Sequence, residues 1–125
     1  MLDTHTILWF FSAHPNLSTV AQNLIENETH EKLISIASVW EMAIKQNQKK
    51  LNLGKSAAKY VEEKLEFPDF QLLTIDLQHL ELISSLESYH RDPFDRLLIS
   101  QAIAEDITLI SKDKAFDLYP VKRIW

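Results

Sequence analysis

The sequence contains no cysteine and a single glycine, Gly54, among its 125 residues. Without cysteine the chain cannot form a disulfide framework, a thiolate zinc site, an iron–sulfur cluster or a cysteine nucleophile. With one glycine it cannot form a P-loop or a dinucleotide-binding fingerprint, because both need several glycines that let backbone N–H groups approach phosphate. Any phosphate group must therefore be bound by something other than a glycine-rich loop.

Long hydrophobic runs are also missing. The longest apolar run near the start, ILWFF at residues 7–11, is far shorter than the roughly 20 residues of a membrane-spanning helix. No basic residue precedes this run, so we expect neither a signal peptide nor membrane association, and a cytoplasmic location. A net charge of −5 argues against a protein that coats nucleic acid nonspecifically, but it leaves room for a local basic patch.

Helix-start signals recur along the chain. Segments with helical apolar periodicity follow four residues that favour the N-cap, namely Ser18, Ser38, Ser56 and Asp76. Glu41 stands three residues after Ser38, as in a capping box. Asp92 followed by Pro93 predicts the capped start of another helix, which we expect to end near residue 106.

Short runs of branched apolar residues separate these helices, at residues 32–37, 71–75, 108–111 and 121–125. They have the length and composition of β-strands, and Met1 and Leu2 would form the stub of a first strand. Strands that alternate with helices predict an α/β protein with a parallel sheet and helices on both faces, in three layers α/β/α. No repeat or linker divides the chain, so we expect one domain over residues 1–125.

Acidic residues follow the predicted strands. Asp3 ends the first strand, Glu41 follows the second, Asp95 lies near the start of a helix and Asp113 follows the run TLIS. Ligands bind at the carboxyl ends of the strands in open parallel sheets, so these four acids are expected to converge there. Clustered carboxylates repel unless a cation lies among them, and oxygen ligands suit Mg²⁺ or Mn²⁺.

Each of these acids also has a structural interpretation. Glu41 would complete the capping box, Asp95 would favour the dipole of the helix capped by Asp92, and Asp113 would cap a short helix. Asp3 is the exception, because an acid that directly ends a buried strand has little structural purpose. The predicted common location of the acids therefore carries more weight than any one of them.

Four segments together resemble one family: LDTHT from residue 2, SVWEMA from residue 38, HRDPFDRLLI from residue 90 and TLISKD from residue 108. In their order and spacing, over essentially the whole chain, they resemble PIN-domain ribonucleases. The resemblance is closest to the toxin components of VapBC-type toxin–antitoxin modules. As a combination the four segments are specific, although none is so alone.

The resemblance implies a single PIN domain with metal-dependent endoribonuclease activity. Asp3, Glu41, Asp95 and Asp113 match the acidic quartet of the family. This quartet would hold Mg²⁺ or Mn²⁺ for in-line attack of water on an RNA phosphodiester. We expect Asp3 and Asp95 to be direct ligands, and Glu41 and Asp113 to act through water. The resemblance further implies a homodimer and a cognate antitoxin.

Several other residues are candidates for contact with RNA. They are Thr4, Thr6, Arg91, Arg96, Lys45 and Lys49. A cap is the alternative role for the threonines, and a salt bridge to Asp92 or Asp95 is the alternative for the arginines. His5 and His90 could donate a proton or contact RNA, but structural or polar-rim roles are favoured, because neither has a metal-ligand spacing to another histidine. The two lysines belong to residues 45–64, where six lysines stand against two glutamates, as expected of a surface that holds a polyanion.

Two other functions remain open at this point. In a phosphoaspartate protein Asp3 would accept phosphate beside Lys112 or Lys114, but Thr4 and His5 stand where such proteins place a further acid. In a catalytically inactive PIN-like scaffold the chain would bind RNA or a partner without cutting. Four converging acids without a cation would destabilise such a scaffold, which favours the nuclease.

Overall fold

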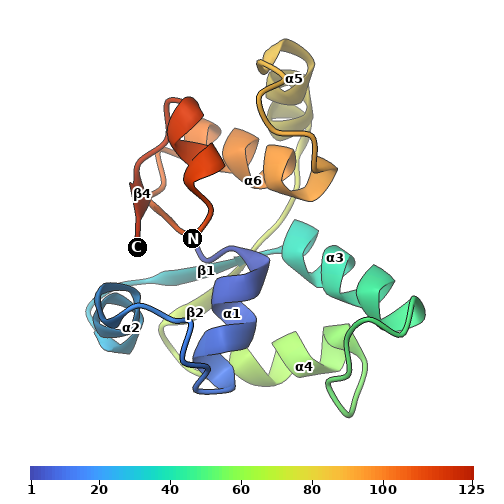
Figure 1. Ribbon diagram of the computed structural model, residues 1–125, viewed down its shortest axis with the longest axis vertical. Helices are drawn as coiled ribbons and strands as arrows, with labels where there is room; N and C mark the ends of the chain where they lie inside the picture. The colour runs from blue at the N-terminus through green and yellow to red at the C-terminus, as the bar shows by residue number, and fades with distance from the viewer.

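A parallel β-sheet lies between two layers of helices in the computed structural model, which describes residues 1–125 (Figure 1). The strands are β1 (Lys32–Ser35), β2 (Phe70–Leu73), β3 (Leu109–Ile110) and β4 (Arg123–Ile124). β1 pairs in parallel with β2, and β3 with β4. Leu2 forms parallel bridges to Ile34 and Ile110 and joins the two pairs, giving the order β2-β1-Leu2-β3-β4. The predicted three-layer α/β/α class is confirmed.

The first strand is as short as the sequence predicts, yet it occupies the centre of the sheet. The Leu2 N–H donates to the Leu33 carbonyl at 3.0 Å, and the Asp3 N–H donates to the Ile110 carbonyl at 3.2 Å. Both neighbouring strands therefore fix the backbone at this point. The next residues begin a helix, so Asp3 stands where the central strand ends.

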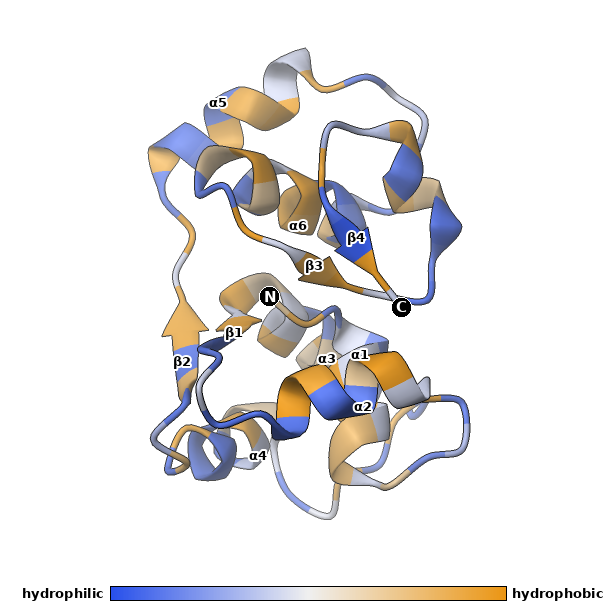
Figure 2. Cartoon of the chain, turned by 90° about the vertical axis from the view of Figure 1, so that its left-hand side faces the viewer, coloured by the Kyte–Doolittle hydropathy of each residue, from blue (hydrophilic) through white to orange (hydrophobic).

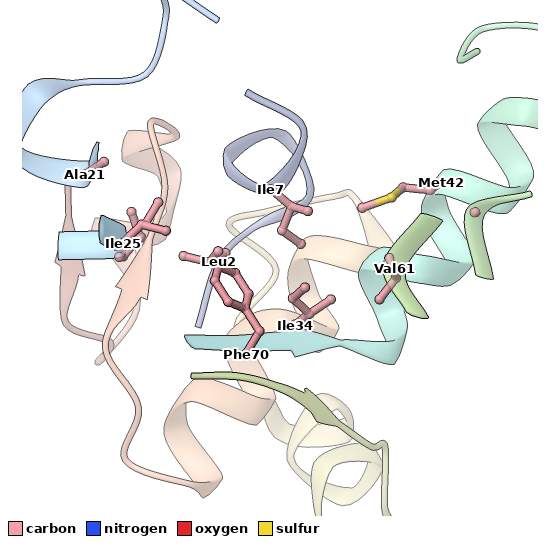
Figure 3. Packing of buried hydrophobic residues seen from close by; sticks show 10 residues of the cluster. Leu2, Ile7, Ala21, Ile25, Ile34, Met42, Val61 and Phe70 are labelled. Atoms are coloured by element: carbon pink, nitrogen blue, oxygen red, sulfur yellow. The ribbon is translucent and has the colours of Figure 1, made fainter. Parts of the chain in front are cut away.

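One layer consists of α1 (Thr4–Phe11), α2 (Thr19–Glu26), α3 (Ile36–Asn47) and α4 (Ala57–Lys64). Their apolar residues pack on one face of the sheet, where Leu2, Ile34 and Phe70 meet Ile7 of α1 and Met42 of α3 (Figure 3). All five side chains are buried. Removing this apolar area from water, at about 25 cal/mol per Å², fixes α1 and α3 against the end of the central strand.

The other layer consists of α5 (Leu77–Ser85), α6 (Pro93–Ala104) and a 3₁₀ helix, η1 (Lys114–Leu118). Figure 2 shows α5 and α6 on the opposite side of the sheet from α1 to α4. Leu98 and Ile99 of α6 pack with Leu109 and Phe116 in a second apolar core. Because the residues from Leu97 to Ala102 are buried, α6 is fixed against the sheet and its less buried first turn has a defined position.

Most predicted helix starts are confirmed, but the start of α3 differs. Ser18, Ser56, Asp76 and Asp92 accept backbone N–H groups as N-caps. The predicted cap at Ser38 is wrong, because α3 begins at Ile36 and the Ser35 hydroxyl accepts the Ala37 N–H at 3.0 Å. Ser35 also donates to Gln101 at 2.5 Å. Because Ser35 caps α3, β1 ends two residues before the predicted end. None of the helices combines the length and the hydropathy of a membrane-spanning segment.

Candidate active site

Asp3 is fixed through both of its carboxylate oxygens. It caps α1, where Oδ1 accepts the Thr6 N–H at 2.7 Å, and Oδ2 accepts the hydroxyl of Ser111 at the end of β3. The side chain of Thr6 is fully buried and donates to the Ile110 carbonyl at 3.1 Å. Asp3 itself is 6% exposed, so its carboxylate has one well-defined position at the end of the central strand.

Glu41 lies in the second turn of α3 on its buried side. Its Oε2 accepts the Thr4 hydroxyl at 2.5 Å, and its Oε1 lies 2.7 Å from Lys45 Nζ. The capping-box interpretation of Glu41 is wrong, because the cap is Ser35 and not Ser38. A buried carboxylate with two such partners is held in one orientation, since losing either would leave a desolvated oxygen unpaired.

Asp95 lies in the first turn of α6, where the Asp92 carboxylate accepts the N–H groups of Phe94 and Asp95 at 2.9 and 3.0 Å. The pKa of Asp95 is raised to about 7, chiefly by burial and then by the charge of Asp92. The charges of Glu41 and Asp3 contribute to this rise, and only His90 acts against it. Asp95, Asp3 and Glu41 are therefore close enough to repel, and an added cation would relieve that repulsion.

His90 lies between Asp113 and Asp95, with a hydrogen bond to Asp113 and an ion-pair distance to Asp95. The His90 Nε2 lies 2.9 Å from Asp113 Oδ2 and 3.2 Å from Asp95 Oδ2. His90 Nδ1 accepts the Asp92 N–H at 3.2 Å, which leaves the proton on Nε2. Burial would raise the pKa of Asp113, but the Ala115 N–H and His90 hold it below its usual value.

The acids meet at one cavity of about 330 Å³, which is lined by Asp3, Asp95, Asp113, His5, Trp9 and Lys112. Three of the four predicted acids thus line one cavity. The fourth, Glu41 on α3, is close enough for its charge to raise the pKa of Asp95. Carboxylate oxygens from several segments, in part already desolvated, form the donor set that Mg²⁺ and Mn²⁺ prefer. The residues present therefore fit a divalent cation.

The two threonines expected to contact substrate point inward instead. Thr4 is 2% exposed and Thr6 is 0% exposed. Thr4 donates to Glu41, and Thr6 donates through its N–H to Asp3. Their hydroxyl and N–H groups hold the acids, so neither residue is in a position to contact a substrate.

Arg96 also has a structural role in place of the expected contact with RNA. Its guanidinium donates to the carbonyls of Glu87 at 2.8 Å and Leu86 at 2.9 Å. The alternative role predicted for Arg96, a salt bridge to Asp92 or Asp95, is not observed either. Arg91 is exposed and stays a candidate for contact with phosphate.

The lysines of residues 45–64 are spread over the end of α3, the loop that follows it and α4. Figures 1 and 2 show α4 away from α6. Lys45 alone among these lysines pairs with an acid of the site. Lys49 lies beyond the end of α3 with a φ of 59° and forms no salt bridge with the acids. Lys55 pairs with Glu63 at 2.7 Å, and Lys64 Nζ lies 4.7 Å from the centre of the Phe11 ring.

A second group of potential metal ligands lies elsewhere, at Asp76, His79 and Glu105. His79 is buried, and its Nδ1 accepts the Asp76 N–H at 3.1 Å while its Nε2 lies 3.0 Å from Glu105 Oε1. Both ring nitrogens are therefore already used, in the capping box of α5 and in its link to the end of α6. This group is explained by structure alone.

Sequence reasoning did not assign a role to Ser111, and it placed His90 at the rim. Ser111 donates to Asp3 and accepts the Asp113 N–H at 3.0 Å, so one hydroxyl links two acids of the quartet. The available signal was the position of Ser111 as the last residue of a predicted strand, next to the edge where the acids converge. His90 had a weaker signal, because its hydrogen-bond partner Asp113 lies in a separate segment.

Comparisons with known proteins give a family for this fold. The family model for the PIN domain matches residues 1–122. No curated protein sequence matches the chain. The fold is similar to that in the crystal structure of VapBC2 from Rickettsia felis bound to a DNA fragment from their promoter. The TM-score is 0.73 at 18% identity, over 99% of this chain and 96% of that one. The chain belongs to the PIN domain family.

Proposed function

We propose that this protein is a metal-dependent endoribonuclease that hydrolyses RNA phosphodiester bonds at the cavity lined by Asp3, Asp95 and Asp113. The observation that carries the proposal is the convergence of these acids on one cavity at the strand ends of a PIN-domain fold. A hydrogen-bond network also supports the proposal, because Thr4, Thr6, Ser111 and His90 each donate a hydrogen bond to an acid of the quartet.

Asp3 and Asp95 are the proposed direct ligands of Mg²⁺ or Mn²⁺. Asp3 presents a carboxylate that Thr6 and Ser111 hold in place, and Asp95 presents one whose pKa of about 7 favours exchange of a proton for a metal ion. When bound, one or two such ions supply Lewis-acid stabilisation of the phosphate and lower the pKa of water.

Glu41 and Asp113 are the proposed acids that act through water. Thr4 and Lys45 orient Glu41, so that its carboxylate can accept a hydrogen bond from the attacking water. Attack on phosphorus breaks the bond to the 3′ oxygen, which leaves and takes up a proton. His90 donates to Asp113 and keeps this carboxylate beside Asp95.

The biological role that fits this activity is that of a toxin with a cognate antitoxin. The similar structure is a VapBC2 complex, and the sequence motifs resemble the toxin components of such modules. We propose a protein antitoxin that covers the acidic cavity, and a homodimeric toxin. Expression of the protein alone would then arrest growth, and Asp3→Asn would relieve the arrest. A harmless wild type with nuclease activity in vitro would contradict the toxin role and leave the nuclease.

The nuclease is tested by incubating the purified protein with single-stranded RNA in Mg²⁺, in Mn²⁺ and in excess EDTA. We expect cleavage with either metal and none with EDTA or with Asp95→Asn. Glu66→Gln is the matched control, because Glu66 is an exposed acid without a partner, and this variant should cut like the wild type. Cleavage that persists in EDTA and in Asp95→Asn would overturn the mechanism. Binding without cleavage would indicate an inactive scaffold.

A further inference from the structure

A second, basic cavity adjoins the acidic one. Its volume is about 580 Å³, and it is lined by Lys112, Lys114, Arg123, Ile124 and Trp125. Lys112 lines both cavities. The surface therefore changes from acidic to basic across one residue, which is the distribution needed to hold a polyanion beside a site that would contain a cation.

Aromatic side chains line both the acidic and the basic cavity. The ring of Trp9 lies 5.8 Å from that of Trp125 and 5.6 Å from that of His5, measured between centroids. Lys112 Nζ lies 5.6 Å from the centre of the Trp9 ring. His5 and Trp9 line the acidic cavity and Trp125 lines the basic one. The three rings therefore form a continuous aromatic surface that extends over both cavities.

Neither lysine of the basic cavity is held in a salt bridge, although the charge of Lys114 contributes to the lowered pKa of Asp117. Lys112 and Lys114 are exposed, and neither forms a hydrogen bond or a salt bridge through its side chain. Arg123, by contrast, donates to both oxygens of Asp117 at 2.7 Å and to the Ser111 carbonyl at 2.9 Å. Lys112 and Lys114 are therefore the cations of the basic cavity that remain free to bind a ligand.

We propose that the surface formed by His5, Trp9, Lys112, Lys114 and Trp125 binds the unpaired RNA strand beside the scissile phosphate. This proposal rests on the proposed nuclease function, and it names the residues that hold the RNA strand next to the acids. Unpaired bases stack on aromatic rings while lysines contact the backbone phosphates. A duplex keeps its bases stacked on each other, so it would gain only the contacts of the lysines.

This assignment differs from the one that composition favours. The basic residues 45–64 have a larger charge, but Lys45 is the one lysine there that pairs with the acids. That segment has no aromatic side chain in the acidic cavity. The surface from His5 to Trp125 combines free charge, aromatic rings and continuity with the acids.

The test is the affinity of the metal-free protein for a short labelled oligoribonucleotide, measured by fluorescence anisotropy in EDTA over a range of salt concentrations. Lys112→Gln/Lys114→Gln should reduce the slope of log affinity against log salt by about 1.4, or about 0.7 for each phosphate that a lysine no longer neutralises. Lys50→Gln/Lys59→Gln is the matched control, because it removes two exposed and unpaired lysines of the other basic segment. This control should bind like the wild type.

The aromatic contacts have their own variants. Trp9→Leu retains an apolar side chain but removes the stacking surface, and it should weaken binding about tenfold. His5 is exposed, so His5→Ala provides a second variant that leaves the packing of α1 intact, and it should weaken binding in the same direction. Double-stranded RNA should bind more weakly than the single strand and be insensitive to Trp9→Leu.

The possible outcomes separate this proposal from the nuclease function. If the protein cuts RNA but Lys112→Gln/Lys114→Gln and both aromatic variants bind like the wild type, the nuclease stands and this surface is wrong. If these variants lose binding but the wild type never cuts, the surface stands and the nuclease is wrong. The surface is also wrong if the wild type binds no RNA, or if Lys50→Gln/Lys59→Gln weakens binding as much as Lys112→Gln/Lys114→Gln.

Discussion

The Nε2 of His90 lies 3.2 Å from the carboxylate of Asp95, and this histidine is the one neighbour that lowers the pKa of Asp95. Burial and three acids act in the opposite direction and leave the pKa at about 7. In the metal-free protein the His90 N–H therefore compensates only part of the charge of the cluster. The stability of the fold and its affinity for metal should both depend on Asp95.

The stability of the metal-free protein should fall as the pH rises. The pKa of Asp95 is about 7 in the folded state against an ordinary value of 3.8. Between these values the folded state holds a proton that the unfolded chain has lost, so the free energy of unfolding decreases toward pH 7 and stays low above it.

Asp95→Asn removes this dependence. It should be more stable than the wild type by on the order of 2 kcal/mol near pH 8, after allowance for solvent screening, and by less near pH 5. Urea unfolding in EDTA at both pH values measures the difference. An equal difference at the two pH values would contradict the assigned titration.

Divalent cations should stabilise the wild type at neutral pH. A cation at about 100 times its dissociation constant raises the free energy of unfolding by about 2.7 kcal/mol. Asp3→Asn and Asp95→Asn should each lose most of this gain, since each removes a proposed ligand, whereas Glu66→Gln should keep it. Thermal unfolding in Mg²⁺ or Mn²⁺ against EDTA measures the effect. A full gain in Asp95→Asn would place the cation elsewhere.

Much of the fold is predictable because its signals are local. Cap residues such as Ser18 and Asp92 precede periodic apolar segments, and both cap helices in the structure. The boundary between β1 and α3 is the exception. Residues 32–37 are all compatible with a strand, and α3 begins where the Ser35 hydroxyl accepts the Ala37 N–H. The same hydroxyl donates to Gln101, 66 residues away, a contact that leaves no local signal to favour Ser35 over Ser38 as the cap.

The two serines near this boundary should respond differently to alanine. Ser35→Ala removes the cap of α3 and a partner of Gln101, and it should cost about 2 kcal/mol. Ser38→Ala removes a buried hydroxyl that has no hydrogen-bond partner, so it should be neutral or slightly stabilising. Urea unfolding of the two variants gives both values. The reverse order would restore Ser38 as the cap.

The acids of the site are predictable, but the groups that hold them are not. The position of Asp3 follows from its place after a strand, which the structure confirms. The pairing of Thr4 with Glu41 spans 37 residues and depends on how α1 packs against α3. A hydroxyl at the start of a helix is compatible with capping, substrate contact or this pairing, and only the packing of the helices decides among them.

Thr4 should act as a positioning residue. Thr4→Val keeps the shape of the side chain but leaves a buried oxygen of Glu41 without its donor, which should lower stability by about 1–3 kcal/mol. RNA cleavage should fall about tenfold, in kcat more than in KM. Thr4→Ser keeps the hydroxyl and should restore most of the activity, a rescue that a role in packing alone would not produce. Equal activity of the Val and Ser variants would exclude the positioning role.

A cation bound among the four acids is the central feature of the proposed mechanism. Anomalous diffraction from a crystal of the protein grown or soaked with Mn²⁺ locates that ion directly. We expect a manganese peak at the cavity lined by Asp3, Asp95 and Asp113, and no peak there in Asp95→Asn. A peak found only at Asp76, His79 and Glu105, or an acidic cavity without manganese at a saturating concentration, would contradict it.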